Sequence, residues 1–194
     1  MMRFLLILVS SLAAIGGCKS SGGAAQPAQP TQPTQVTEDT TGETQGLTAT
    51  ATMAPTQGSQ TQGTVTFREV PGGVEVTASF QGLSPGDHGF HVHEHGDCSA
   101  PDASSAGGHY NPTGDPHGSP DAPPHHAGDF GNVTAGADGT ATKTLVMEGV
   151  TLAEGPTSLA GKGVIVHEKA DDLVSQPTGD AGGRLACGVI QIDQ

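Results

Sequence analysis

Hydrophobic and polar residues alternate with a period of two along most of the chain after Leu47. Because successive side chains of a β-strand point to opposite faces, this pattern predicts half-buried strands. The runs cover residues 64–67, 74–80, 90–93, 131–134, 142–146, 163–167 and 187–192. Turn sequences such as Pro71-Gly72-Gly73 and Asp138-Gly139 separate them, and the first predicts a hairpin. About eight short strands predict an all-β fold, an antiparallel sandwich or a flattened barrel.

Residues 94–128 interrupt this pattern. They are rich in Gly, Pro, Asp and His and show no alternation. A stretch of this length without secondary structure is uncommon inside a compact domain, and it indicates a functional loop or an external tie.

The composition agrees with an all-β domain. Aromatic residues make up 3% of the chain and Trp is absent, so the core must be built from aliphatic residues and a few phenylalanines, Phe67, Phe80, Phe90 and Phe130. The 30 Gly and 14 Pro disfavour long helices. The formal net charge is −13 with only seven Lys and Arg, which excludes a basic surface for nucleic acid.

The N-terminus has the features of an export signal. Met1-Met2-Arg3 is a short positive start, and residues 4–9 are an apolar run too short to span a bilayer. The following Ile15-Gly16-Gly17-Cys18 resembles a bacterial lipobox, in which cleavage leaves the cysteine as an acylated N-terminus. We therefore expect a signal peptide over residues 1–17 and a lipid on Cys18; an ordinary signal peptide with an incidental cysteine is the alternative.

The predicted domain organisation follows from a change of composition near Gly46. Residues 18–46 are rich in Gln, Pro, Thr and Gly and predict a disordered stalk after the lipidated cysteine. Residues 47–194 are predicted to form the folded domain. We expect an exported protein of a bacterial cell envelope, anchored to membrane lipid and facing the periplasm or the cell exterior.

All nine histidines lie between His88 and His167. His91 and His93 are two apart in a predicted strand, so both rings face one side and can reach one ion, whereas Val92 faces the core. The loop that follows carries further imidazole and carboxylate groups, which suit zinc or copper: His109, His117, His125, His126 and Asp129. A bound metal could order such a polar loop; the alternatives are a solvated His-rich loop and, for His167, a hydrogen-bonded core histidine.

Several motifs, in this order, resemble the Cu/Zn superoxide dismutase family over residues 47–194. They are Gly89-Phe90-His91-Val92-His93-Glu94, Gly108-His109-Tyr110-Asn111-Pro112, His126-Ala127-Gly128-Asp129, Gly131-Asn132-Val133, Val166-His167-Glu168-Lys169-Ala170-Asp171-Asp172 and Gly183-Arg184-Leu185-Ala186-Cys187-Gly188-Val189-Ile190. The resemblance implies a Greek-key fold with long metal-binding loops, and copper and zinc as cofactors.

The resemblance also implies a role for each site residue. Copper is expected on His91, His93, His109 and His167, and zinc on His109, His117, His126 and Asp129. His109 would be shared by the two ions and would pass a proton to the product. Asp171 would accept hydrogen bonds from one histidine on each side, and Arg184 would attract the anionic substrate. His88 matches a structural histidine, whereas His95 and His125 receive no role.

The resemblance implies a disulfide between Cys98 and Cys187, which would tie the metal loop to the last strand. The spacing from His93 to Cys98 resembles bacterial members, whereas the spacing from His109 to Asp129 is similar to animal ones. The sequence leaves monomer and homodimer both open.

The resulting functional hypothesis is disproportionation of superoxide by a copper centre with a structural zinc, which would protect the cell envelope. The alternatives are a non-enzymatic copper- and zinc-binding lipoprotein and a metal-free interaction module. Residues 173–183 contain no Lys, Arg or Glu, so we expect weaker electrostatic steering of superoxide than in members with charges there.

Overall fold

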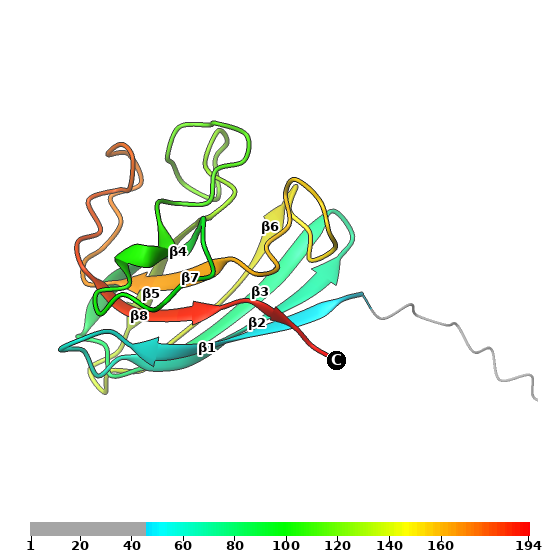
Figure 1. The fold of residues 1–194 in the computed structure, drawn as a ribbon. Helices are drawn as coiled ribbons and strands as arrows, with labels where there is room; N and C mark the ends of the chain where they lie inside the picture. Colours follow the sequence, from blue (N-terminus) through cyan, green and yellow to red (C-terminus); the bar gives the residue numbers. More distant parts are fainter. Residues whose placement is uncertain (1–45) are drawn as a thin grey trace, which may run out of the picture. The chain divides into compact units, whose positions relative to one another are not determined.

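A computed structural model describes residues 46–194 (Figure 1). They form nine strands and one short 3₁₀ turn, and none of these residues forms a helix long and apolar enough to cross a membrane. The strands are β1 (Thr48–Pro55), β2 (Gln62–Val70), β3 (Gly73–Gln81), β4 (Gly86–His93), β5 (Asp129–Ala135), β6 (Ala141–Glu148), β7 (Gly163–His167), β8 (Arg184–Val189) and β9 (Gln191–Ile192). The prediction of an all-β fold is confirmed.

The sheet closes into a barrel. Its strand order is β2-β3-β6-β5-β4-β7-β8-β1-β9, and β2 also pairs with β1, so eight antiparallel strands form a ring and β9 adds to β1. The connections from β3 to β4 and from β6 to β7 each skip two strands, which is the Greek-key pattern expected. Closure leaves the ring without an edge.

Alternating burial along the strands builds the core. In β3 the side chains of Val74, Val76, Ala78 and Phe80 are buried, and most of the residues between them are exposed. Phe90 packs edge-to-face on two rings, with centroid distances of 5.5 Å to Phe80 and 5.3 Å to Phe130, an arrangement that aromatic pairs prefer. A few phenylalanines therefore fill the centre of a barrel otherwise lined by aliphatic side chains.

The predicted hairpin between β2 and β3 is confirmed. Val70 pairs with Gly73, and only Pro71 and Gly72 lie between them. The φ of Gly72 is 90°, a conformation that L side chains avoid and glycine adopts freely.

Two loops rise together on one side of the barrel (Figure 1). One joins β4 to β5 and the other joins β7 to β8. The first, residues 94–128, is more ordered than its sequence indicates: it contains the 3₁₀ turn at Ser104–Ala106, and His109 forms an isolated bridge with His93. Contacts distant in sequence, which a local pattern does not report, give the loop its shape.

Candidate metal centre

The barrel places three histidines on its outer face. In β4, Val92 belongs to the core cluster, so His91 and His93 point the other way. His91 lies opposite Ile165 of β7, and His167 is two residues further along that strand, on the same face. Residues 94–128 cover this face, which leaves the rings of all three histidines buried.

A first group of four buried imidazoles forms here, with one nitrogen of each ring within 4.8 Å of the others: His91, His93, His109 and His167. The remaining nitrogen of three rings is already bonded. His91 Nε2 lies 2.7 Å from Asp171 Oδ2, and Nδ1 of His93 and His167 donate to the carbonyls of Gly107 and Gly182 at 3.0 and 3.3 Å. Such bonds fix tautomer and ring orientation, and they leave the other nitrogen of each ring directed into the group.

A second group is centred on Asp129 and consists of His109, His117, His126 and Asp129. The Nδ1 atoms of the three rings lie 2.8, 3.0 and 3.2 Å from Asp129 Oδ1, in that order. Ligands bound tetrahedrally to zinc at ordinary distances are separated by about 3.3 Å. The donor set and its spacing therefore fit a zinc ion, and His109 belongs to both groups.

Unpartnered nitrogens support metal binding by these residues. Within residues 46–194, four buried ring nitrogens have no hydrogen-bond partner: His91 Nδ1, His109 Nε2, His117 Nδ1 and His126 Nδ1. Buried polar atoms are rarely left unpaired in proteins. Each of these four residues belongs to one or both of the two groups, so one bound cation in each group would account for all four atoms.

Asp171 connects the two groups. Its Oδ2 accepts from His91 Nε2 at 2.7 Å and its Oδ1 accepts from His117 Nε2 at 2.9 Å, with all three side chains fully buried. The Oδ1 atom also accepts the backbone N–H of Leu173 at 2.7 Å. One carboxylate thus orients a histidine of each group.

The protonation states suit ligation. Burial lowers the pKa of His91 to about 4, although its bond to Asp171 opposes this, and burial also lowers the pKa of His93 and His167. These rings are therefore neutral at pH 7, the form that binds metal. Burial alone would raise the pKa of Asp129 and Asp171, but hydrogen bonds from the neighbouring histidines outweigh it and lower both.

His117 lies between these two carboxylates. Burial opposes its protonation, but the nearby Asp129 carboxylate, the hydrogen bond to Asp171 and the charges of both carboxylates outweigh burial and raise its pKa to about 9. The same concentration of negative charge favours a divalent cation at this position.

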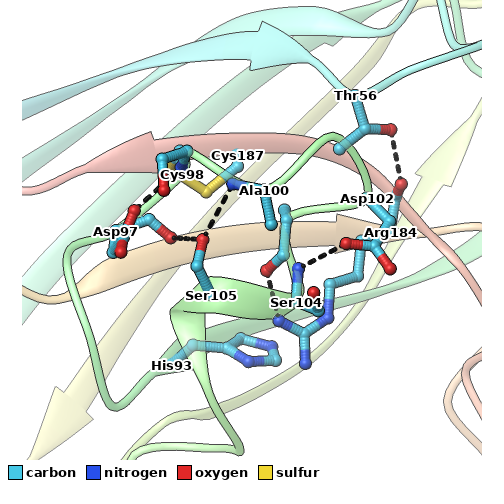
Figure 2. The surroundings of a disulfide bond; sticks show 12 residues. Thr56, His93, Asp97, Cys98, Ala100, Asp102, Ser104, Ser105, Arg184 and Cys187 are labelled. Atoms are coloured by element: carbon cyan, nitrogen blue, oxygen red, sulfur yellow. Dashed lines mark hydrogen bonds between the residues drawn. A yellow bond between two sulfur atoms is a disulfide. The ribbon is translucent and has the colours of Figure 1, made fainter.

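Arg184 lies beside the first group, at the start of β8 (Figure 2). Its guanidinium donates to the carbonyls of Ala103 and Gly107, both at 2.6 Å, and the backbone carbonyl of Arg184 accepts from the Thr56 hydroxyl at 2.6 Å. Burial lowers the pKa of Arg184 and nearby Asp102 opposes this, but a guanidinium remains charged in proteins. A fixed positive charge therefore stands next to the four imidazoles.

A disulfide joins β8, the strand that contains Arg184, to the loop whose carbonyls accept the hydrogen bonds of Arg184. Cys98 is bonded to Cys187, 89 residues later, with a Cα–Cα distance of 5.8 Å. The loop segment is braced further by Ser105, whose hydroxyl donates to the Asp97 carbonyl and accepts from the Ala100 N–H at 2.8 and 3.1 Å (Figure 2). The bridge and these bonds hold the acceptors of Arg184 in place.

The remaining histidines lie outside both groups. His88 is buried and its Nδ1 bonds to the carbonyl of His167 at 2.8 Å, while its Nε2 reaches Ser84. His95 is exposed, and His125 bonds through Nδ1 to the carbonyl of its neighbour His126 at 2.8 Å. His88 therefore supports the backbone of a candidate ligand.

Three groups that position the candidate metal ligands or Arg184 were not found from the sequence. The Gly107 carbonyl, the Gln176 side chain and the close approach of Gly179 to Asp171 all depend on how separate loops meet. A glutamine or glycine in a polar loop carries no pattern that would have indicated these contacts. The proposed lipidation site Cys18, the signal peptide and most of the stalk lie outside the described residues.

The comparisons agree with this geometry. The family model described as copper/zinc superoxide dismutase matches residues 61–190, a range that contains both groups, Asp171 and Arg184. The crystal structure of the clock protein EA4 is similar to this chain, with 40% sequence identity and a TM-score of 0.69. The match covers 78% of this chain and 98% of the EA4 chain.

Proposed function

Because this chain belongs to the copper/zinc superoxide dismutase family, we propose that it converts superoxide to dioxygen and hydrogen peroxide. The observation that carries the proposal is His109, shared by two buried donor groups, with Arg184 held beside one of them. A protein that only stored metal ions would have no use for a fixed cation beside one of the groups.

Members of the family bind copper and zinc, and we assign each ion by its donors. The all-imidazole group of His91, His93, His109 and His167 suits copper. The group that includes Asp129 suits zinc, since three imidazoles and one carboxylate at tetrahedral spacing are typical zinc ligands. His109 would then serve both ions, because its Nδ1 lies 2.8 Å from Asp129 Oδ1 in the zinc group and its Nε2 is the ring nitrogen that remains for the copper group.

The proposed reaction consumes two superoxide anions and two protons, and yields one dioxygen and one hydrogen peroxide. Bound copper supplies the one-electron cycling that this reaction needs, whereas zinc has no redox chemistry. Arg184 attracts and orients the anion by its charge, and the fork of its guanidinium stays fixed by Ala103 and Gly107. Within residues 46–194, His109 Nε2 has no hydrogen-bond partner; this atom would be a copper ligand and, whenever it is not bound to the ion, would carry a proton for the product.

The test is to load the purified protein with copper and zinc and to measure metal content and superoxide consumption on the same sample. We expect one copper and one zinc per chain and fast, cyanide-sensitive turnover. Full metal occupancy with negligible turnover would instead support the alternative, a copper- and zinc-binding protein without enzymatic activity. Failure to retain either metal would contradict both functions.

We further propose that the protein acts in a bacterial cell envelope, tethered by a lipid on Cys18. The support is the N-terminal sequence, a positive start and apolar run followed by Gly16-Gly17-Cys18. The test is incorporation of labelled fatty acid during expression in a bacterium. Labelling that disappears in Cys18→Ser supports the anchor, whereas an unlabelled, soluble parental protein would refute it.

A further inference from the structure

A single glutamine side chain joins the two loops above the barrel. Gln176 lies in the loop between β7 and β8 and reaches His117 in the loop between β4 and β5. Its Oε1 accepts the backbone N–H of His117 at 2.8 Å, and its Nε2 donates to the backbone carbonyl of the same residue at 2.9 Å. The amide thus pairs with both polar backbone groups of one residue, as a neighbouring strand would.

These two bonds satisfy the backbone N–H and the backbone carbonyl of His117. Within residues 46–194 its N–H and carbonyl make no hydrogen bond to another backbone group, although the residue is buried. Buried backbone groups need partners, and Gln176 supplies both of them. Its side chain therefore sets the position of the backbone from which the His117 ring extends.

The loop that presents Gln176 is itself braced. The carboxylate of Asp172 accepts the backbone N–H groups of Val174 and Ser175 at 3.0 and 2.8 Å. The N–H of Gly179 donates to the Ser175 carbonyl at 2.7 Å, and the N–H of Asp172 donates to the Gly179 carbonyl at 2.9 Å. Gln176 therefore lies in a loop segment that is held in shape by its own hydrogen bonds.

The same loop also holds the other end of His117. Asp171 accepts from the Nε2 of its ring at 2.9 Å, while Gln176 holds its backbone. With both ends fixed, the remaining ring nitrogen Nδ1 is directed at Asp129 Oδ1, 3.0 Å away. A glutamine amide carries no charge and so attracts superoxide weakly. It does have the donor and the acceptor that the backbone of His117 needs.

We propose that Gln176 is a positioning residue for metal binding by His117, and that residues 173–183 of the loop between β7 and β8, which contain no Lys, Arg or Glu, serve to retain zinc. The inference rests on the proposed function, which assigns zinc to His117, His126, Asp129 and the shared His109. Outer residues that orient a ligand typically change metal affinity by about 10- to 100-fold.

The experiment compares Gln176→Met, which keeps the side-chain volume but loses both hydrogen bonds, with Gln176→Ala. Val174→Ala is the matched control, because Val174 lies in the same loop and is 71% exposed. Cobalt(II) bound in place of zinc reports ligand geometry through its visible spectrum, and a chromophoric chelator measures zinc release. Circular dichroism of each metal-free protein shows whether it is folded.

We expect both Gln176 variants to lose zinc affinity by about tenfold and to alter the cobalt spectrum. The copper absorption and the copper affinity of the zinc-free protein should stay as in the parent, and Val174→Ala should match the parent throughout. Parental zinc affinity in Gln176→Met would overturn the inference, as would an equal loss of copper and zinc, which would mark a general structural role. A parental protein that takes neither zinc nor cobalt at this position would refute the proposed function itself.

Discussion

Arg184 and His93 donate to the same acceptor, the carbonyl oxygen of Gly107, at 2.6 and 3.0 Å. One backbone group therefore fixes both the cation that would attract the substrate and a ring that would bind copper. Because neither side chain can shift without disturbing this carbonyl, the distance between the guanidinium and the copper group is set by the loop rather than by the rotamer of a long side chain.

Removal of the Arg184 charge should slow the reaction without removing the metals. For Arg184→Gln we expect the rate constant with superoxide to fall by about tenfold or more, since local positive potential raises encounter rates with anions by roughly 10- to 1000-fold. Arg184→Lys should retain part of the rate. Stopped-flow or pulse-radiolysis kinetics on fully metallated samples measure this, and an unchanged rate for Arg184→Gln would exclude a guiding role.

The dependence of the rate on salt should be shallow. Residues 173–183 have no Lys, Arg or Glu, so attraction near the site is limited, and the net charge of −13 opposes it at long range. Between about 10 and 150 mM salt, where the screening length falls from roughly 30 to 8 Å, we expect less than about a twofold change. A steep decrease would reveal a steering field that this loop does not supply.

Gly179 should tolerate no side chain. Its φ is +65°, and a Cβ added there would overlap Asp171 Oδ1 and lie 2.7 Å from His117 Nε2. Gly179→Ala should therefore displace the bridging carboxylate and reduce zinc content. The matched control is Gly161→Ala, with a φ of +74° and open space around the added Cβ. This variant should lose only about 1–2 kcal/mol of unfolding free energy, the cost of a left-handed backbone for an L residue. Equal zinc content in the two variants would refute the contact argument.

The disulfide should stabilise the domain and keep the Arg184 acceptors in place. Cys98→Ser removes a cross-link between residues 89 apart, and such losses typically cost about 2–5 kcal/mol. Denaturant unfolding of the metal-free protein, with and without reductant, measures the difference. If the parent in reductant and the variant unfold at the same denaturant concentration as the oxidised parent, the bridge contributes nothing to stability.

Glu69 should make stability depend on pH far from the metal groups. Its Oε1 accepts from the Thr151 hydroxyl and from the N–H groups of Leu152 and Ala153, and these bonds, with that of Thr151 the largest, lower its pKa below 4.5. A lowered folded-state pKa gives stability that is complete above the unfolded pKa and is lost as pH falls through the folded one. Glu69→Gln should therefore be less stable than the parent near pH 7, by about 1 kcal/mol.

The difference between Glu69→Gln and the parent should shrink as pH falls below 4.5. Thermal unfolding from pH 7 down to the acid limit of folding checks this. A constant difference across that range would mean that the carboxylate charge is not what holds residues 151–153.

Short-range sequence patterns predicted the features that depend on residues close in sequence, namely strand positions and the face to which a side chain points. Alternation located Val74–Phe80 within β3, and the spacing of His91 and His93 placed both rings on one face. The ligand sets came from a family resemblance, because nothing local connects His109 with Asp129 or His91 with Asp171. Gln176 escaped detection for the same reason: an exposed glutamine gains its role only when its loop meets another, 59 residues away in sequence.

The bridge made by Asp171 has a thermodynamic consequence. Binding of an ion by His117 would order Asp171, and an ordered Asp171 holds His91 in the orientation that the other ion needs. The two binding equilibria are then coupled, and coupling between sites is reciprocal: whatever factor zinc contributes to copper affinity, copper must contribute to zinc affinity. Partly loaded protein should accordingly be scarce, with chains tending to hold both ions or neither.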